Sequence, residues 1–276
     1  MRDLSYNCAT MTSEPAPTIR ELLAFYVEAG VDCALGETPI DRLEEETTPP
    51  ARPIATPPAP RQTAAVAAPP RGDATLAPDA AVMAARELAP KAASLDELRA
   101  LLETFNGCAL KATATRLVFA DGNPQSRIMF VGEAPGREED LEGLPFVGRS
   151  GKLLDRMMAA VGFNRSNVYI ANIIPWRPPG NRDPSPQETQ ICLPFIRRQI
   201  ELVDPDVLVC LGKPSSQAVL DLKDGIMKSR GRWIEYHTGK RAIRAMATFH
   251  PAYLLRSPSY KRLSWQDFRA IAKALG

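Results

Sequence analysis

Short segments that are apolar along their whole length alternate with helix-like segments over most of the C-terminal part of the chain. The short segments are typical of strands, whereas the others carry apolar residues at helical spacing. A strand without polar positions must be buried on both faces, and a parallel sheet covered by helices provides that burial. The sequence therefore predicts an α/β fold with three layers, α/β/α. The predicted strands are 127–132, 167–175, 206–212 and one that runs from 243 to a His-Pro turn, and the predicted helices include 151–162, 186–203, 214–222 and 265–275.

The N-terminal part differs in composition, and this difference sets the expected domain boundaries. Residues 1–46 contain one short amphipathic helix, expected over 18–30 because a capping box opens it and a glycine ends it. Residues 47–92 are rich in Pro, Ala and Thr. Such a segment has too little large apolar surface to offset its ordering entropy, so it is predicted to be a disordered linker. A second capping box at Ser94 opens a helix, and we expect the folded domain over 93–276.

Composition excludes several classes of protein. Apolar residues make up 45% and charged residues 24% of the chain, as is usual for globular proteins. The sequence has no apolar run long enough to cross a membrane, and its N-terminus lacks the apolar core of a signal peptide. The five cysteines form no CxxC pair and suggest no disulfide framework. We therefore expect a soluble, cytoplasmic protein with reduced thiols and no contact with a membrane.

Charge is unevenly distributed between the two parts of the chain. Residues 1–100 carry 9 Lys/Arg against 15 Asp/Glu, and residues 101–276 carry 25 against 17. A basic body of this kind suits a polyanionic partner such as nucleic acid. Each basic side chain near the strand ends could be a solvated surface charge, but together they could follow a phosphate backbone. These residues are Arg177, Arg182, Arg230, Arg232, Arg256, Lys261 and Arg262.

Polar side chains stand where the predicted strands end. Glu133 follows the first strand, Asn172 interrupts the apolar run of the second, and His250 follows the last. In parallel sheets, ligand-binding groups gather at the carboxyl ends of the strands, so these side chains are expected to converge. A buried amide without partners costs about 1–3 kcal/mol, so Asn172 must find partners or meet a ligand. Its adjacent donor and acceptor match the edge of a pyrimidine.

The loop GEAPGREEDLEGLPFVGRSG, residues 132–151, follows the first strand. It is not a phosphate-binding loop, because it is rich in acids and no Gly-Lys-Ser/Thr follows it. Glu133 is either a solvated loop acid or a working carboxylate. Phe146 is either a core residue or an accessible ring, on which stacking of a base would contribute about 1–3 kcal/mol. The other acids are expected in an exposed turn or at a helix N-terminus: Glu138, Glu139, Asp140 and Glu142.

Four stretches together resemble the family 4 uracil-DNA glycosylases. They are VGEAPGREEDLEGLPFVGRSGKLL, YIANIIPWRPPGNR, PDVLVCLG and FHPAYLLRSP, which occur in order, with compatible spacing, within about residues 105–268. The resemblance implies a central four-stranded parallel sheet flanked by helices. It also implies a base-excision-repair enzyme that hydrolyses the N-glycosidic bond of deaminated cytosine in DNA and leaves an abasic site.

The resemblance also implies roles for individual residues. Glu133 matches the acid linked to the attacking water, and His250 matches the group near uracil O2, where negative charge develops. The uracil-binding residues implied are Gly132, Phe146 and Asn172. Tyr253, Leu254, Leu255 and Arg256 match a loop that enters the DNA groove, where an apolar wedge could hold the base stack open. The predicted DNA-binding residues are Arg177, Arg182, Leu254 and Arg256.

The sequence departs from the family at the iron–sulfur cluster. Most members hold a [4Fe–4S] cluster through four cysteines, but here only Cys108 and Cys192 match ligand positions. Phe105 and Trp176 stand at the other two. Two thiolates cannot hold a cubane, so we expect no metal and no cofactor. Phe105 and Trp176 are expected to form a small hydrophobic cluster in its place.

Several alternatives remain open from the sequence. The chain could be a DNA-binding module of the same fold without catalysis, or a glycosylase for another deaminated base such as hypoxanthine. The presence of Glu133, Phe146, Asn172 and His250 together favours an active uracil glycosylase. How thymine is excluded stays open, because Gly136 offers no bulky side chain. We expect a monomer that acts on single- or double-stranded DNA, with residues 18–30 packed on the domain or available to a protein partner.

Overall fold

The computed structural model describes Thr18 and residues 78–276 of the chain. The described residues from 78 onward belong to one unit, Ala67–Gly276. The helix expected over 18–30, apart from Thr18, and the first part of the expected linker lie outside the described residues. Within the described part, none of the helices has the length and apolar character that a membrane span requires.

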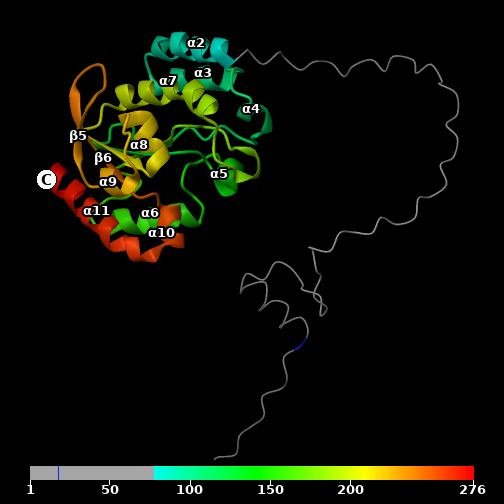
Figure 1. Cartoon of the computed structure of the whole chain (residues 1–276). Helices are drawn as coiled ribbons and strands as arrows, with labels where there is room; N and C mark the ends of the chain where they lie inside the picture. Colours follow the sequence, from blue (N-terminus) through cyan, green and yellow to red (C-terminus); the bar gives the residue numbers. More distant parts are fainter. Residues whose placement is uncertain (1–17, 19–77) are drawn as a thin grey trace, which may run out of the picture. The chain divides into compact units, whose positions relative to one another are not determined.

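A six-stranded sheet forms the middle of this unit, in the order β1-β3-β2-β4-β6-β5 (Figure 1). Strands β3, β2, β4 and β6 pair in parallel with one another, whereas β1 and β5 pair antiparallel at the two edges. The predicted α/β class is therefore confirmed. The strands are β1 (Asp121–Gly122), β2 (Ile128–Gly132), β3 (Tyr169–Asn172), β4 (Val207–Leu211), β5 (Trp233–His237) and β6 (Ala242–Thr248).

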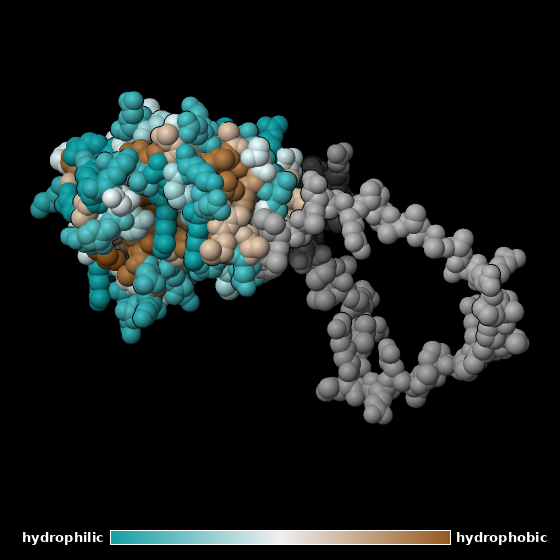
Figure 2. Space-filling view, turned by 90° about the horizontal axis from the view of Figure 1, so that it is seen from above, coloured by the Kyte–Doolittle hydropathy of each residue, from teal (hydrophilic) through white to brown (hydrophobic). Residues whose placement is uncertain are grey.

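Helices cover both faces of the sheet (Figure 1). One layer contains α2 (Pro78–Leu88), α3 (Leu95–Thr104), α7 (Pro186–Val203) and α8 (Lys213–Leu220), and the opposite layer contains α6 (Arg149–Ala159), α10 (Pro251–Arg256) and α11 (Lys261–Leu275). Seen from outside, the first layer is largely hydrophilic, with smaller apolar patches between the charged side chains (Figure 2). The short helices are η1 (Ala89–Lys91), α4 (Leu110–Thr113), α5 (Arg137–Glu142), η2 (Pro179–Asn181), α9 (Ile226–Ser229) and η3 (Pro258–Tyr260).

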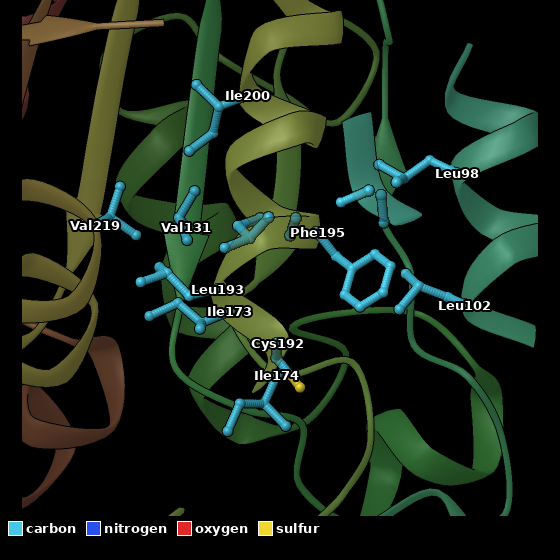
Figure 3. Close-up of a cluster of buried hydrophobic side chains, with 14 of the residues drawn as sticks. Leu98, Leu102, Val131, Ile173, Ile174, Cys192, Leu193, Phe195, Ile200 and Val219 are labelled. Carbon is cyan, nitrogen blue, oxygen red and sulfur yellow. The ribbon is translucent and has the colours of Figure 1, made fainter. Parts of the chain in front are cut away.

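The side chains of each inner strand alternate between two buried clusters. On β2, Met129 and Val131 pack toward α7, whereas Ile128 and Phe130 pack toward α6 and α11. Figure 3 shows the cluster on the α7 side, where Phe195 of α7 lies beside Leu98 and Leu102 of α3. β2 and β4 are buried at every position and carry no polar side chain, because both faces of these strands are covered. β3 ends in the buried polar residue Asn172, and β6 carries the exposed Arg244 near its start.

The two edge strands were not predicted. β1 is only two residues long, and its sequence, Asp-Gly, is typical of a turn. β5 is partly exposed along its length, and its sequence is polar and aromatic rather than continuously apolar. Continuous apolar runs therefore mark the parallel strands but not the strands at the edges, which do not need two buried faces.

The expected linker is wrong from Pro78 onward, because residues 78–91 are helical. Alanine has the highest helix propensity, and its small side chain allows helices to approach closely. Ala81 and Ala85 of α2 are fully buried. The guanidinium of Arg198 in α7 donates hydrogen bonds of 2.9 and 2.7 Å to the carbonyl of Ala92. The folded region therefore includes residues 78–92, which the sequence assigned to the linker.

Candidate functional site

A cavity of about 590 Å³ opens at the edge of the sheet where β2, β3 and β6 end. Glu133, Phe146, Asn172 and His250 all line it. They come from the loops after β2 and from the ends of β3 and β6, so residues far apart in the sequence converge, as the strand ends predicted. Gly212 follows β4 and packs against His250 rather than lining the cavity itself. A Cβ on this glycine would lie 3.0 Å from the His250 Cβ.

Gly132 allows two of these side chains to lie close together. It pairs with Asn172 across the parallel β2–β3 register. A Cβ at position 132 would clash with Asn172 Oδ1 and with the ring of Phe146. Only glycine therefore lets the amide and the ring meet at this point of the cavity.

Asn172 is 4% exposed, and its Oδ1 atom has no hydrogen-bond partner among the described residues. Leaving a buried acceptor unpaired costs about 1–3 kcal/mol. Buried polar groups are paired in the great majority of cases, so an unpaired one that lines a cavity indicates a ligand with a complementary donor.

Phe146 forms part of the wall next to Asn172. Its ring centroid lies 5.5 Å from that of His250, with 33° between the two planes. Its backbone has a φ of 56°, in the left-handed region that an aromatic residue rarely adopts. The ring therefore reaches its place through an unusual backbone conformation.

His250 lies two residues after Thr248, the last residue of β6, and directly before α10, whose first residue is Pro251. Its Nδ1 accepts a hydrogen bond of 3.1 Å from the backbone N–H of Ala252. Burial, with a smaller effect from Arg256, lowers the pKa of His250 to about 4. The imidazole is therefore neutral near pH 7, and because Nδ1 accepts, Nε2 carries the proton and acts as a donor.

Glu133 is the first residue after β2 and shares the cavity with Asp183. Burial, with a smaller effect from the negative charge of Asp183, raises the pKa of Glu133 to about 7. A carboxyl group with this pKa changes protonation state near neutral pH and can act as a general base. The cavity thus combines a base, a neutral donor, an amide and an aromatic ring.

The chain's family follows from its similarity to known proteins. The sequence matches the model of the uracil DNA glycosylase superfamily over residues 119–269, a span that contains all four of these cavity residues. The chain belongs to the uracil-DNA glycosylase superfamily.

Three relatives in this superfamily carry the name Type-4 uracil-DNA glycosylase. The protein from Archaeoglobus fulgidus is 40% identical over 187 residues, which cover 66% of this chain and 94% of the relative. The protein from Thermotoga maritima is 46% identical over 153 residues, 55% of this chain and 78% of the relative. The protein from Sulfurisphaera tokodaii is 37% identical over 183 residues, 64% of this chain and 83% of the relative. The resemblance to family 4 that the motifs indicated is confirmed.

The helix N-terminus offered for the acids in the glycine loop of this uracil-DNA glycosylase superfamily member is confirmed for Glu138, Glu139 and Asp140, which lie in the first turn of α5. The burial of two of them was not predicted, since Glu139 and Asp140 are 6% and 3% exposed. The Glu139 carboxylate accepts hydrogen bonds from the backbone N–H groups of Gly136, Val147 and Gly148. Asp140 accepts from the backbone of Thr115 and Arg116 and from the Thr115 hydroxyl. Both acids are buried because they satisfy backbone donors.

The three arginines predicted to contact DNA differ in exposure and in their partners. Arg256 is exposed and lines the cavity. Arg182 also lines it but forms a two-pronged ion pair with Glu188. Arg177 is largely covered and donates to Asn181 at 2.7 Å.

Leu254 is fully buried, so its assignment as a groove contact is wrong. Leu255 is 38% exposed and lines the cavity, and it is the leucine that α10 presents to solvent. The sequence motif alone does not tell which leucine of a helical turn points outward. Sequence reasoning also missed Arg137 and Arg149, two exposed cations that line the cavity at either end of the glycine loop.

The corner that would hold a [4Fe–4S] cluster in the family does not fit one here. Phe105 and Trp176 are buried, and the Phe105 ring packs edge-on against Phe195, with centroids 5.0 Å apart. Cys108 and Cys192 lie in the same cluster as buried free thiols. Among the described residues there is no group of three or more His, Cys, Asp or Glu side chains that could hold a metal ion. Two thiols beside two aromatic rings do not form the donor set of a cubane.

Proposed function

We propose that the chain hydrolyses the N-glycosidic bond of uracil that arises in DNA by deamination of cytosine, releasing uracil and leaving an abasic site. The observation that carries this proposal is the buried, unpaired Oδ1 of Asn172 in a cavity shared with Phe146, Glu133 and His250. The similarity to proteins named Type-4 uracil-DNA glycosylase supports the same activity.

The target base reaches the cavity by leaving the duplex stack, at a cost of a few kcal/mol. The amide of Asn172 then pairs with the base edge, its Oδ1 accepting from N3–H of uracil. Cytosine has no proton at N3, so it would leave Oδ1 unpaired. The ring of Phe146 stacks against the base, and such a contact contributes about 1–3 kcal/mol.

In the chemical step, the C1′–N1 bond breaks, and its electron pair leaves with uracil as the anion. The oxygen of a water molecule forms the new bond to C1′, and Glu133 accepts a proton from that water. His250 donates a hydrogen bond from Nε2 to O2 of uracil, where negative charge develops. The uracil anion then takes up a proton from solvent.

We propose that Arg137, Arg149, Arg182 and Arg256 contact DNA phosphates around the cavity, with Arg177 near its rim. Charges at these positions would serve single- and double-stranded DNA alike, because the phosphate backbone is common to both. Leu255 is the apolar side chain proposed to enter the base stack.

We propose that the enzyme works without a [4Fe–4S] cluster, because only two of the four ligand positions hold cysteine. Packing of Phe105, Phe195 and Trp176 would stabilise that corner instead. Iron analysis of the purified protein should give far less than the about four atoms per chain of a cubane.

We propose that the enzyme acts in the cytoplasm and that it acts as a monomer, since Glu133, Phe146, Asn172 and His250 meet in one cavity without a contribution from a second copy. Light scattering at working concentration tests this. Activity per chain that rises with protein concentration would contradict it.

The test of the function is release of uracil from labelled oligonucleotides, read by alkaline cleavage at the abasic site. The wild-type protein should release uracil, Asn172→Ala should lose most of the activity, and Glu138→Ala should retain it. Equal activity of the two variants would refute the site. Oligonucleotides with thymine or hypoxanthine measure specificity, and DNA binding without release of any base would identify a non-catalytic module.

A further inference from the structure

Phe146 occupies a backbone conformation that its side chain disfavours. Its φ of 56° lies in the left-handed region, where the Cβ of a non-glycine residue crowds the following carbonyl oxygen. Among the described residues the other non-glycine positions with positive φ are Asn or Asp, which tolerate this region better. The surrounding structure must therefore hold Phe146 in place.

The guanidinium of Arg165, in the loop between α6 and β3, holds the carbonyl side of this turn. It donates hydrogen bonds to the backbone carbonyls of Phe146 and Pro145, the latter at 3.1 Å. Its own position is fixed by two carboxylates, since it pairs with Asp121 of β1 and, at 3.0 Å, with Asp155 of α6. Arg165 is not among the residues that line the cavity.

The amide side of the same turn is held from the opposite direction. Glu139 accepts hydrogen bonds from the N–H groups of Val147 and Gly148 at 3.0 and 2.9 Å. Gly151 in α6 leaves room for the Phe146 carbonyl, because a Cβ at this position would clash with it. The peptide groups around Phe146 are thus fixed by an arginine on one side and a carboxylate on the other.

We propose that Arg165 is a positioning residue for base recognition, which holds Phe146 in the left-handed conformation so that its ring stays beside Asn172. A guanidinium suits this role because its planar fork can serve two carbonyls and two carboxylates at once, which a lysine cannot. Asp121 of the short edge strand β1 therefore affects the cavity indirectly, because it holds Arg165, which in turn holds Phe146. The proposal rests on the glycosylase function, through the ring that stacks on the base.

A double-mutant cycle tests whether Arg165 acts through Phe146. Phe146→Ala should lower kcat/KM for uracil release by about 5- to 150-fold, the range expected for loss of one stacked base contact. Arg165→Gln should lower it by about 5- to 50-fold in the wild-type background but by less than about twofold in the Phe146→Ala background. Equal losses in the two backgrounds would show a general structural role and overturn the proposal.

The matched control is Arg241→Gln. Arg241 lies in the turn of the β5–β6 hairpin and, like Arg165, bridges two aspartates, here Asp204 and Asp206. Its kcat/KM should stay within about twofold of the wild-type value. Arg165→Lys should restore less than half of the lost activity, since an ammonium cannot form the fork.

Amide hydrogen exchange of the full chain tests the same contacts without relying on activity. The amides of Val147 and Gly148 should exchange at least about tenfold faster in Arg165→Gln than in Arg241→Gln, because the turn that Glu139 caps loses its other support. If the Val147 and Gly148 amides of Arg165→Gln exchange no faster than those of Arg241→Gln, the proposal is overturned, whatever the activity of the variant. A wild-type protein that releases no uracil would refute the proposed function, and the exchange result would still decide whether Arg165 holds the turn.

Discussion

Glu133 shares its cavity with a second carboxylate, Asp183, and this pair predicts the pH dependence of the reaction. The pKa of Glu133 is raised to about 7, mainly by burial and further by Asp183. Because the carboxylate form is the base, kcat/KM should fall about tenfold per unit as the pH drops below about 7. Asp183→Asn removes the like charge and should lower this pKa by about half a unit to one unit, so activity at pH 6 should rise by about 3- to 5-fold.

The control for this prediction is Asp221→Asn, at the end of α8 and away from the cavity lining. It should leave the midpoint of the profile unchanged. A profile of Asp183→Asn with the wild-type midpoint, or with a higher one, would contradict the role of Asp183.

His250 should act as a neutral hydrogen-bond donor over the whole working pH range. Its pKa is lowered to about 4 by burial, so the ring becomes protonated only under acidic conditions. His250→Ala removes a donor from the developing uracil anion, and loss of such a donor lowers kcat by about 10²–10³-fold. Single-turnover rates should show this loss, with the midpoint near pH 7 retained. His237→Ala, at the exposed end of β5, should keep full activity, and loss of the midpoint in His250→Ala would assign that titration to histidine instead.

At this scale the sequence predicted the side chains that stand at strand ends better than those that fold a loop. Glu133, Asn172 and His250 could be found because each interrupts or follows an apolar run. Glu139 and Asp140 lie at a helix N-terminus, as one of the two alternatives predicted, but their burial was not predicted. A run of acids gives no sign of which members will meet backbone donors. The left-handed conformation of Phe146, and Arg165 as its support, depend on contacts between segments about twenty residues apart and leave no local pattern.

The short helix α10 turns one leucine into the core and the next toward the cavity. Leu254 is fully buried, whereas Leu255 is 38% exposed. Leu255→Ala should lower uracil release from duplex DNA by about fivefold or more and from single strands by less than about twofold, because only the duplex needs a wedge in its stack. Leu254→Ala should instead lower the free energy of unfolding by about 2–5 kcal/mol. Equal losses on both substrates for Leu255→Ala would contradict the wedge.

Among the elements, the buried ones were the most predictable. The helix Pro186–Val203 was predicted with its observed bounds, from its helical spacing and the proline at its first position. The structure adds a capping box between Ser185 and Glu188 at the same end. Helix α2 was missed, because its alanines follow a Pro/Ala-rich segment and carry little apolar surface of their own. It is stable where it packs on α7, a tertiary contact that composition does not reveal. The edge strands β1 and β5 were missed because they need only one covered face.

In the molecule as a whole, the sheet and the loops have separate tasks. Buried strands and two helical layers hold the strand ends at fixed positions, and the side chains that follow these ends form the cavity. The loss of cluster cysteines is compatible with this arrangement, because an aromatic cluster occupies that corner and none of its members lines the cavity. Stability and chemistry can therefore change independently in this fold.

The uneven distribution of charge predicts a strong effect of salt on the whole enzyme. Residues 101–276 carry 25 Lys/Arg against 17 Asp/Glu, and four of the arginines line the cavity. The logarithm of the binding constant for duplex DNA should fall linearly with the logarithm of the salt concentration, with a slope of about 0.9 per phosphate contacted.

Arg149→Ala should reduce that slope by about 0.9 and leave kcat within about twofold, since the Arg149 charge acts on the DNA backbone and not on the reacting bond. Arg127→Ala, at the opposite end of the sheet, where the side chain pairs with Asp206, should leave the slope unchanged. Titrations of binding at several salt concentrations measure both slopes, and an equal slope for the two variants would place the DNA on another surface.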